Sequence, residues 1–169
     1  MLATIGYEKS SVEDLIATLA KSEIDLLVDV RDRAQSRKPG FSKSALRDRL
    51  AEVGIEYLHL RELGDPKEGR DAARAGMMDE FRKIFSAVLA SERAKQALMT
   101  IEFLAQQHTI CLLCYERDHR HCHRKMVSDV LESSLDCVTV HLEVPTIGAD
   151  SRVARRVLHS RKGATASFE

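Results

Sequence analysis

The alternation of short apolar runs with helical patterns is the feature of this sequence that most constrains its fold. Five short apolar runs are predicted to be strands: residues 2–5, 26–30, 55–60, 109–114 and 137–142. The second run is almost continuously apolar, which is typical of a strand buried on both faces of a parallel sheet. Because helical patterns lie between the runs, we predict a single three-layer α/β domain. Its central sheet is expected to be mainly parallel, with about five strands and with helices on both faces.

Apolar residues at spacings of three and four predict the helices between these strands. The first is expected to begin near residue 11, and the second to run from Ser42 to Gly54. Two more are predicted within residues 76–104, and a last one before the fifth strand. The polar stretch that ends at about Ala75 is predicted to be a loop.

Composition and charge indicate a globular protein without a strong overall electrostatic field. Hydrophobic residues make up 44% of the 169 residues and charged residues 31%, so the chain has enough apolar residues for a core. Lys plus Arg and Asp plus Glu number 26 each, so binding to nucleic acid or to a membrane would need a local patch. We expect one domain at residues 1–145, followed by a basic C-terminal tail at 146–169.

The cellular location is predicted from what the sequence lacks. Its amino terminus has no signal-peptide pattern, and no apolar run is long enough to span a membrane. The four cysteines are therefore interpreted as thiols rather than as a disulfide framework. We expect a cytoplasmic protein with no membrane partner, and the sequence does not indicate an oligomeric state.

The stretch 109–133 carries the densest group of reactive side chains. An apolar strand ends at Cys114, a polar loop follows, and a helical pattern begins at about Cys122. In α/β proteins this arrangement builds a ligand site at the carboxyl edge of the sheet. Polar residues at the ends of the other strands should meet it there. We therefore expect the following residues to converge: Tyr7, Asp29, Arg31, His59, Glu62, Cys114, Glu116, Cys122, His123 and Arg124.

Glu116 is the leading candidate for general acid/base catalysis. A partly buried carboxyl group near a second one, such as Asp29, has a raised pKa. Cys122 is expected at a helix amino terminus beside His123, and both features favour the thiolate, so this pair is predicted to be nucleophilic or supporting. The alternatives are ion pairs with neighbouring arginines for the two carboxylates, and core packing for Cys122.

An anion site is predicted at the same helix start. Free backbone N–H groups and the helix dipole attract phosphate, and Arg124, Arg31 and Lys38 would clamp it. We therefore expect an enzyme of the hydrolase or transferase class that acts on a nucleotide or nucleic acid. The alternative is a non-catalytic module that binds a nucleotide or a protein partner. The remaining predicted substrate-binding residues are Tyr7, His59 and Glu62.

The same loop contains thiol and imidazole groups that suit zinc. The alternative metal ligands are Cys114, Cys122 and His123. Their spacing lacks the paired Cys-x2-Cys of structural zinc sites, and Glu116 and Arg124 already provide an acid/base group and an anion-binding group. We therefore expect no cofactor and no bound metal, with zinc as the alternative.

An ordered set of short motifs resembles the family called Domain of Unknown Function 488. The set extends from residue 4 to about residue 131, and it implies an α/β fold and a shared polar site but no particular reaction. The motifs are Thr4-Ile5-Gly6-Tyr7, Asp29-Val30-Arg31, Ser36-Arg37-Lys38-Pro39-Gly40-Phe41, Tyr57-Leu58-His59-Leu60 with Glu62-Leu63-Gly64, Leu113-Cys114-Tyr115-Glu116 and Cys122-His123-Arg124.

Overall fold

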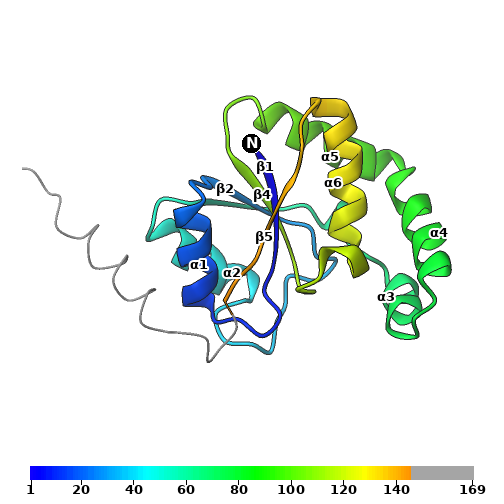
Figure 1. Ribbon diagram of the computed structural model, residues 1–169, viewed down its shortest axis with the longest axis horizontal. Helices are drawn as coiled ribbons and strands as arrows, with labels where there is room; N and C mark the ends of the chain where they lie inside the picture. The colour runs from blue at the N-terminus through cyan, green and yellow to red at the C-terminus, as the bar shows by residue number, and fades with distance from the viewer. Residues whose placement is uncertain (146–169) are drawn as a thin grey trace, which may run out of the picture.

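The protein folds around a five-stranded sheet in a computed structural model that describes residues 1–145 (Figure 1). The strands lie in the order β3-β2-β4-β1-β5, and every neighbouring pair is parallel. The predicted α/β domain with a parallel sheet is confirmed. The predicted basic tail, residues 146–169, lies outside the described residues. The strands are β1 (Leu2–Gly6), β2 (Leu26–Asp29), β3 (Glu56–His59), β4 (Ile110–Cys114) and β5 (Val140–Leu142).

Helices connect the strands throughout the described part of the chain. The α-helices are α1 (Val12–Lys21), α2 (Lys43–Ala51), α3 (Lys67–Arg74), α4 (Met78–Leu89), α5 (Glu92–Leu104) and α6 (His123–Leu135). Two short 3-10 helices are η1 (Arg61–Leu63), which follows β3, and η2 (His119–His121), which precedes α6.

Two predicted segments differ from the structure. The stretch predicted to be a loop up to about Ala75 contains α3. The buried residues of α3 are Gly69 and Ala72, which are too small to produce an apolar stripe in the sequence. The fifth strand is also shorter than predicted, because α6 continues to Leu135 and ends with Asp136 in the left-handed conformation. The chain then needs three residues to return to the edge of the sheet.

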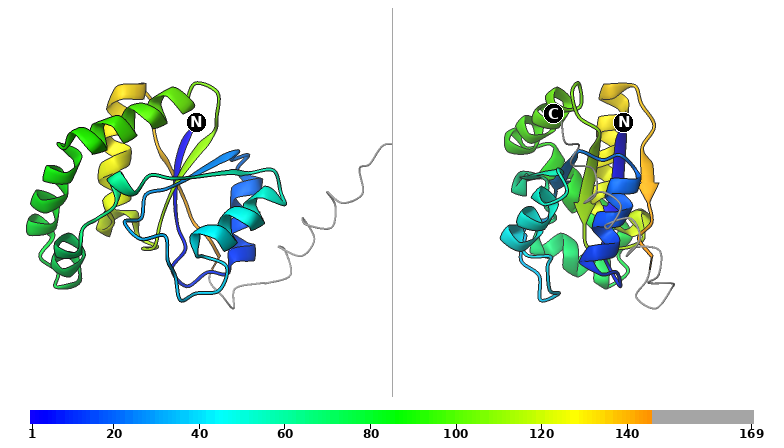
Figure 2. Two further views of the ribbon diagram at one scale, coloured as in Figure 1. Left: turned by 180° about the vertical axis from the view of Figure 1, so that it is seen from behind. Right: turned by 90° about the vertical axis from the view of Figure 1, so that its left-hand side faces the viewer.

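The helices cover both faces of the sheet, as the strand order requires. From β1 to β3 the chain moves toward one edge, and α1 and α2 pack on one face. From β3 to β5 it moves the opposite way, and α3, α4, α5 and α6 lie on the other face (Figures 1 and 2). Parallel strands are joined by right-handed crossovers, so a reversal of direction moves the helices to the opposite face.

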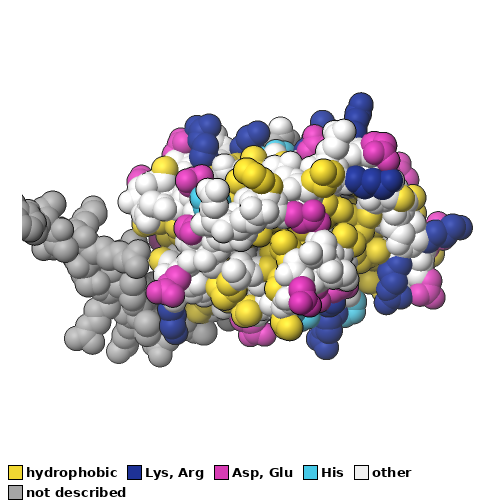
Figure 3. Space-filling model, turned by 90° about the horizontal axis from the view of Figure 1, so that it is seen from above, with side chains coloured by type: hydrophobic (Ala, Val, Ile, Leu, Met, Phe, Trp, Pro, Cys, Tyr) yellow, Lys and Arg dark blue, Asp and Glu magenta, His cyan; other side chains and the backbone are white. Residues whose placement is uncertain are grey.

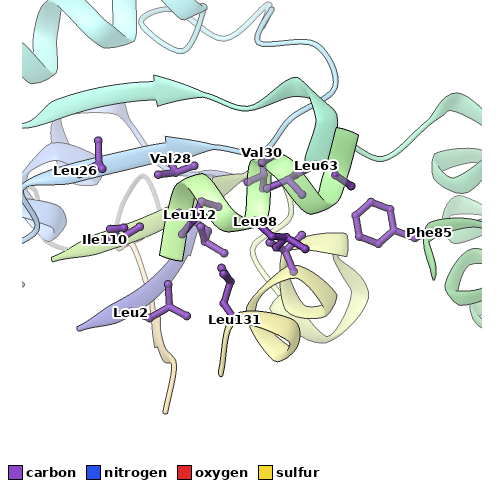
Figure 4. Close-up of a cluster of buried hydrophobic side chains, with 14 of the residues drawn as sticks. Leu2, Leu26, Val28, Val30, Leu63, Phe85, Leu98, Ile110, Leu112 and Leu131 are labelled. Carbon is purple, nitrogen blue, oxygen red and sulfur yellow. The ribbon is translucent and has the colours of Figure 1, made fainter. Parts of the chain in front are cut away.

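Alternate residues of β1, β2, β3 and β4 enter two separate cores. On the face covered by α4, α5 and α6, Val28 and Leu112 belong to a buried cluster that includes Phe85 (Figure 4). On the opposite face, Leu27 and Leu113 belong to a cluster with residues of α1 and α2. A register shift by one residue would exchange these two sets, so burial of both faces specifies the strand register.

The surface carries charges of both signs. Figure 3 shows acidic and basic side chains interspersed around one face, with hydrophobic side chains gathered toward its middle. This mixture agrees with the equal numbers of acidic and basic residues. Within residues 1–145, no helix combines the length and the apolar character that crossing a membrane requires.

The amino terminus of α1 depends on a side-chain cap that a matched serine can test. Ser11 Oγ accepts a hydrogen bond from the backbone N–H of Asp14 at 3.0 Å. Ser42 occupies the same position in α2, but its side chain makes no cap hydrogen bond. Ser11→Ala should therefore lower the free energy of unfolding by about 1 kcal/mol, and Ser42→Ala by less. Urea denaturation measures both, and equal losses would contradict this difference.

Candidate functional site

The carboxyl edge of the sheet opens where neighbouring connections diverge. β4 lies between β1 and β2. The chain leaves β4 toward α6 on one face, whereas it leaves β1 and β2 toward α1 and α2 on the other. Such divergence forms a crevice at the carboxyl ends of the strands, where α/β proteins bind ligands. The loop between β4 and α6 lies at this crevice.

A cavity of about 350 Å³ occupies this edge. Cys114, Glu116 and His123 line it, and two of these, Cys114 and His123, are buried, so they mark its inner end. Tyr7 and Tyr115 add aromatic surface. Three of the arginines that line the cavity are exposed and mark its mouth, namely Arg33, Arg37 and Arg74, whereas Arg70 is half-buried and Arg31 is buried.

Four groups that can donate an electron pair to a metal ion meet at the inner end of the cavity. They are the Cys114 and Cys122 thiols, the Glu116 carboxyl and the His123 imidazole. We call them the donor cluster. One atom of each lies within 4.8 Å of the other three. Glu116 Oε2 accepts hydrogen bonds from Cys114 Sγ at 3.1 Å and from Cys122 Sγ at 3.0 Å. His123 Nδ1 lies 3.6 Å from Cys114 Sγ and 3.9 Å from Cys122 Sγ.

Secondary structure positions three members of the donor cluster. Cys114 is the last residue of β4, and Cys122 is the N-cap residue of α6, which begins with His123. His123 Nε2 lies 2.8 Å from the carbonyl oxygen of Val30 and donates to it, because that oxygen can only accept. The other ring nitrogen, Nδ1, therefore faces the two sulfurs without a proton in the neutral form.

Arg124 fixes the backbone of the loop between β4 and α6. Its side chain is buried, and its terminal nitrogens donate to the backbone carbonyls of Glu116 and Arg117. The guanidinium therefore fixes the backbone that carries Glu116, and it adds a positive charge near the donor cluster. Its Nε has no hydrogen-bond partner among the described residues.

The buried thiols differ in acidity. Burial favours the neutral form of Cys122, but a hydrogen bond with Cys114 and the charges of His123 and Arg124 lower its pKa well below the usual value. Burial likewise opposes a charge on His123, but the neighbouring Cys122 raises the pKa of His123 to about 9. Burial and the same neighbour raise the pKa of Cys114. The hydrogen bonds and charges within the donor cluster therefore make Cys122 the more acidic of its two thiols.

Two carboxyl groups that line the cavity also have raised pKa values. Burial and the adjacent Cys122 raise the pKa of Glu116 to about 7. Burial raises the pKa of Asp65 to about 6, against the positive charges of His123 and Arg70. Asp65 is buried, and its Oδ1 has no hydrogen-bond partner within residues 1–145. Perturbed carboxyl groups in an open cavity are typical of functional sites.

Asp29 and Arg31 bind each other beside the cavity. Arg31 donates to Asp29 from Nε at 2.8 Å and from a terminal nitrogen at 2.5 Å. Its other terminal nitrogen donates to the Tyr7 hydroxyl at 2.8 Å and to the Phe41 carbonyl at 3.0 Å. The Tyr57 hydroxyl donates to Asp29 at 2.6 Å. All three guanidinium nitrogens are therefore engaged, and the network forms a wall of the cavity.

Comparison with known proteins adds one finding. A family model described as a domain of unknown function, DUF488, matches residues 11–131, well over half of the chain. The chain belongs to the DUF488 family. The match contains the whole donor cluster and ends within α6. No curated protein and no solved structure gives a significant match to this chain.

The predicted site residues of this DUF488 chain meet only in part. The structure brings Tyr7, Arg31, Glu116 and His123 to one cavity, and Cys122 lies against Glu116. Asp29 lies behind Arg31 and has no exposed surface.

The other predicted residues lie around this cavity rather than in it. Lys38 Nζ donates to the backbone carbonyl of Tyr7 at 3.0 Å. His59 and Glu62 line a neighbouring hollow, and Arg124 lines another beside η2. The expected single cleft does not form, because β2 lies between β3 and β4 and two strand spacings separate their ends by about 10 Å. Whether these residues bind substrate stays a prediction.

The structure adds residues that the sequence interpretation of this DUF488 chain missed. These are Asp65, which lies just before α3, and Arg70 and Arg74 of α3, and all three line the cavity. The sequence contains one signal for them, because Asp65 precedes Pro66 and an Asp-Pro pair favours a turn that begins a helix. That signal was too weak without a visible apolar stripe in α3.

Proposed function

We propose that this protein is an enzyme of the hydrolase or transferase class that acts on a phosphate-bearing substrate, a nucleotide or nucleic acid. The observation that carries the proposal is the position of the donor cluster. Carboxyl, thiol and imidazole groups lie at the inner end of a cavity whose mouth is lined by arginines. This arrangement supports the proposal, because groups able to move protons or attack a substrate lie beyond groups able to bind its anionic part.

The charges around the cavity favour an anionic substrate. Its lining contains more arginines than carboxyl groups. Guanidinium groups bind phosphate through paired N–H donors, and those of Arg33 and Arg37 are exposed at the mouth. The amino terminus of α6 lies at the inner end and adds the positive end of a helix dipole.

Glu116 is assigned the proton transfer. Cys114, Cys122 and His123 are buried, whereas Glu116 is half-buried and lines the cavity. Its Oε2 is held by both thiols, so the carboxyl group has a defined position. A fixed carboxyl group that a substrate can reach meets the geometric requirement for general acid/base catalysis.

Tyr115 favours a nucleotide over other phosphate compounds. Its side chain is 48% exposed and lines the cavity, and its ring lies 5.3 Å from that of Tyr7 in an edge-on arrangement. An aromatic ring held at the mouth of a cavity can stack on a nucleobase of any identity. The proposal therefore includes mononucleotides and single-stranded nucleic acid.

Arginine substitution tests the substrate class. The full chain would be titrated with ADP and with a short single-stranded DNA and RNA at fixed salt concentration. Arg37→Ala should weaken binding about tenfold, because it removes a charge-assisted hydrogen bond to phosphate. Arg82→Ala is the matched control, since Arg82 is exposed on α4 and pairs with Asp79 at 2.7 Å. Equal weakening by both variants, or no binding of any ligand, would contradict the proposal.

Glu116→Gln separates catalysis from binding. The substitution keeps the shape of the side chain but removes proton transfer, so turnover of a bound nucleotide or nucleic acid should fall about 100-fold or more. Affinity should change much less, and product formation measured by chromatography checks turnover. Binding by the unaltered protein without any turnover would instead favour a non-catalytic module.

We also propose a cytoplasmic location. All four cysteines are free: Cys111, Cys114, Cys122 and Cys137. Two of them lie together in the donor cluster as thiols, which supports a reducing compartment.

A further inference from the structure

We infer that Cys114, Glu116, Cys122 and His123 bind one divalent metal ion of the zinc class. The ligands come from the end of β4, the loop after it and the start of α6, with one donor atom of each within 4.8 Å of the rest. The inference concerns the same site as the proposed function and deepens it. It can be tested alone, because metal binding is measured without turnover.

The distances within the donor cluster fit tetrahedral coordination. With Zn–S of about 2.3 Å and Zn–N or Zn–O of about 2.0 Å, a sulfur and a nitrogen or oxygen ligand lie about 3.5 Å apart. The two sulfur–oxygen distances are 3.0 and 3.1 Å. The two sulfur–nitrogen distances are 3.6 and 3.9 Å. These four values lie on both sides of 3.5 Å, which is compatible with binding of all four atoms to one ion.

The types of ligand atom select the metal. Two sulfurs, one imidazole nitrogen and one carboxylate oxygen suit zinc, whereas magnesium and calcium prefer oxygen ligands throughout. In their deprotonated forms, the two buried sulfurs and the Glu116 carboxylate need a positive counter-charge. A divalent cation supplies that counter-charge and binds the groups in their deprotonated forms.

The surroundings orient the ligands as in metal sites. His123 donates from Nε2 to the Val30 carbonyl at 2.8 Å, which leaves Nδ1 directed at the sulfurs. Metal-binding histidines are typically held in this way by a backbone carbonyl or a carboxylate. Arg124 fixes the backbone of Glu116 through its carbonyl. Secondary structure thus positions three of the four ligands, and Arg124 fixes the backbone of the fourth.

Glu116 is the ligand that substrate or water can displace. It is half-buried, whereas the other three ligands are buried. Catalytic zinc sites typically have three protein ligands and one exchangeable position. A displaced Glu116 carboxylate stays beside that position, where it can accept a proton from incoming water. Metal binding and the acid/base assignment of Glu116 are therefore compatible.

Cobalt titration and elemental analysis test the inference on the full chain. Protein prepared without added metal should contain close to one zinc per chain. After reduction and chelation, Co²⁺ should bind one per chain and produce the near-ultraviolet charge-transfer band of thiolate ligands, and Zn²⁺ should remove this band. Circular dichroism before and after chelation establishes that the chain is still folded.

Variants assign the ligands. Cys122→Ser should lower Co²⁺ affinity about 100-fold or more. In other metal sites, loss of a hydrogen bond to a ligand already lowers metal affinity about 10- to 100-fold, and here a ligand itself is lost. Cys137→Ser is the matched control, since Cys137 lies outside the donor cluster, and it should keep stoichiometry and spectrum. Glu116→Gln should keep the thiolate band with weaker binding, because both sulfurs remain.

Three outcomes would overturn the inference. The first is that the folded, reduced chain takes up no metal at micromolar concentrations. The second is that Cys137→Ser alters the cobalt spectrum as much as Cys122→Ser does, and the third is a Cys114–Cys122 disulfide whose reduction restores no metal binding. Metal-loaded protein that neither binds nor turns over nucleotides would defeat the proposed function and leave the metal site. Full nucleotide turnover by chelated protein would show that the reaction does not need the metal. If the chain took up no metal, the metal site itself would be refuted.

Discussion

Replacing Asp29 by alanine should lower the free energy of unfolding by about 3–5 kcal/mol, the range for breaking a buried ion pair. Asp29 has no exposed surface and accepts from the Arg31 side chain, the Arg31 backbone N–H and the Tyr57 hydroxyl. Without it, the buried guanidinium of Arg31 has no counter-charge in this network. Burial opposes that charge, and the Asp29 carboxylate is the main factor that raises the pKa of Arg31.

An exposed ion pair provides the control for Asp29. Asp48 accepts from Arg47 at 2.8 Å, and both side chains are more than half exposed. Asp48→Ala should change the free energy of unfolding by at most about 1 kcal/mol, because solvent screens such pairs. Urea denaturation followed by circular dichroism measures both variants. A loss below about 1 kcal/mol for Asp29→Ala would mean that Arg31 finds another partner.

Gly6→Ala should destabilise the fold by about 3 kcal/mol or more, the upper end of the effect of overpacking. A Cβ atom at Gly6 would overlap the backbone carbonyl oxygen of Glu116 and lie 2.7 Å from its carbonyl carbon and 3.1 Å from Arg117 Cα. These are backbone atoms, so no side-chain rotation relieves the overlap. The loop that carries Glu116 would have to move away from β1, and the donor cluster would be displaced with it.

Gly54 separates this steric effect from backbone strain. Its φ is +76°, but a Cβ atom there would meet nothing within 4 Å. Gly54→Ala should therefore cost about 1–2 kcal/mol through the left-handed conformation alone. Chemical denaturation measures both variants, and Co²⁺ uptake should fall for Gly6→Ala but not for Gly54→Ala. A smaller loss for Gly6→Ala than for Gly54→Ala would contradict close packing of the loop on β1.

The architecture could be predicted because its signals are local. Almost continuous apolar runs such as the one at residues 26–30 indicate strands covered on both faces. Their alternation with helical patterns leaves few topologies. Helix α3 could not be predicted in this way. Its buried residues are Gly69 and Ala72, and its stability comes from packing rather than from an apolar stripe.

The candidate site could be located but not assembled from the sequence. A polar loop between a strand and a helix indicated the carboxyl edge, and Cys114, Glu116, Cys122 and His123 were all identified there. Two features argued against a metal: the spacing lacks a paired cysteine motif, and Glu116 and Arg124 already provide an acid/base group and an anion-binding group. The distances among the four donor atoms, which depend on the path of the loop over Gly6, favour the opposite interpretation.

The sequence by itself determined the α/β class, the parallel sheet and the segment that carries the reactive groups, since each follows from neighbouring residues. Only the tertiary structure decided which of several possible partners each charged group takes. Arg31 was predicted to bind an anion or Asp29, and the buried Asp29 carboxylate engages it. Asp65 enters the cavity from the segment just before α3, which is far from β4 in the chain. Such pairings depend on the distances between strand ends, which the sequence does not reveal. They also depend on burial, because an unpaired charge is costly away from water.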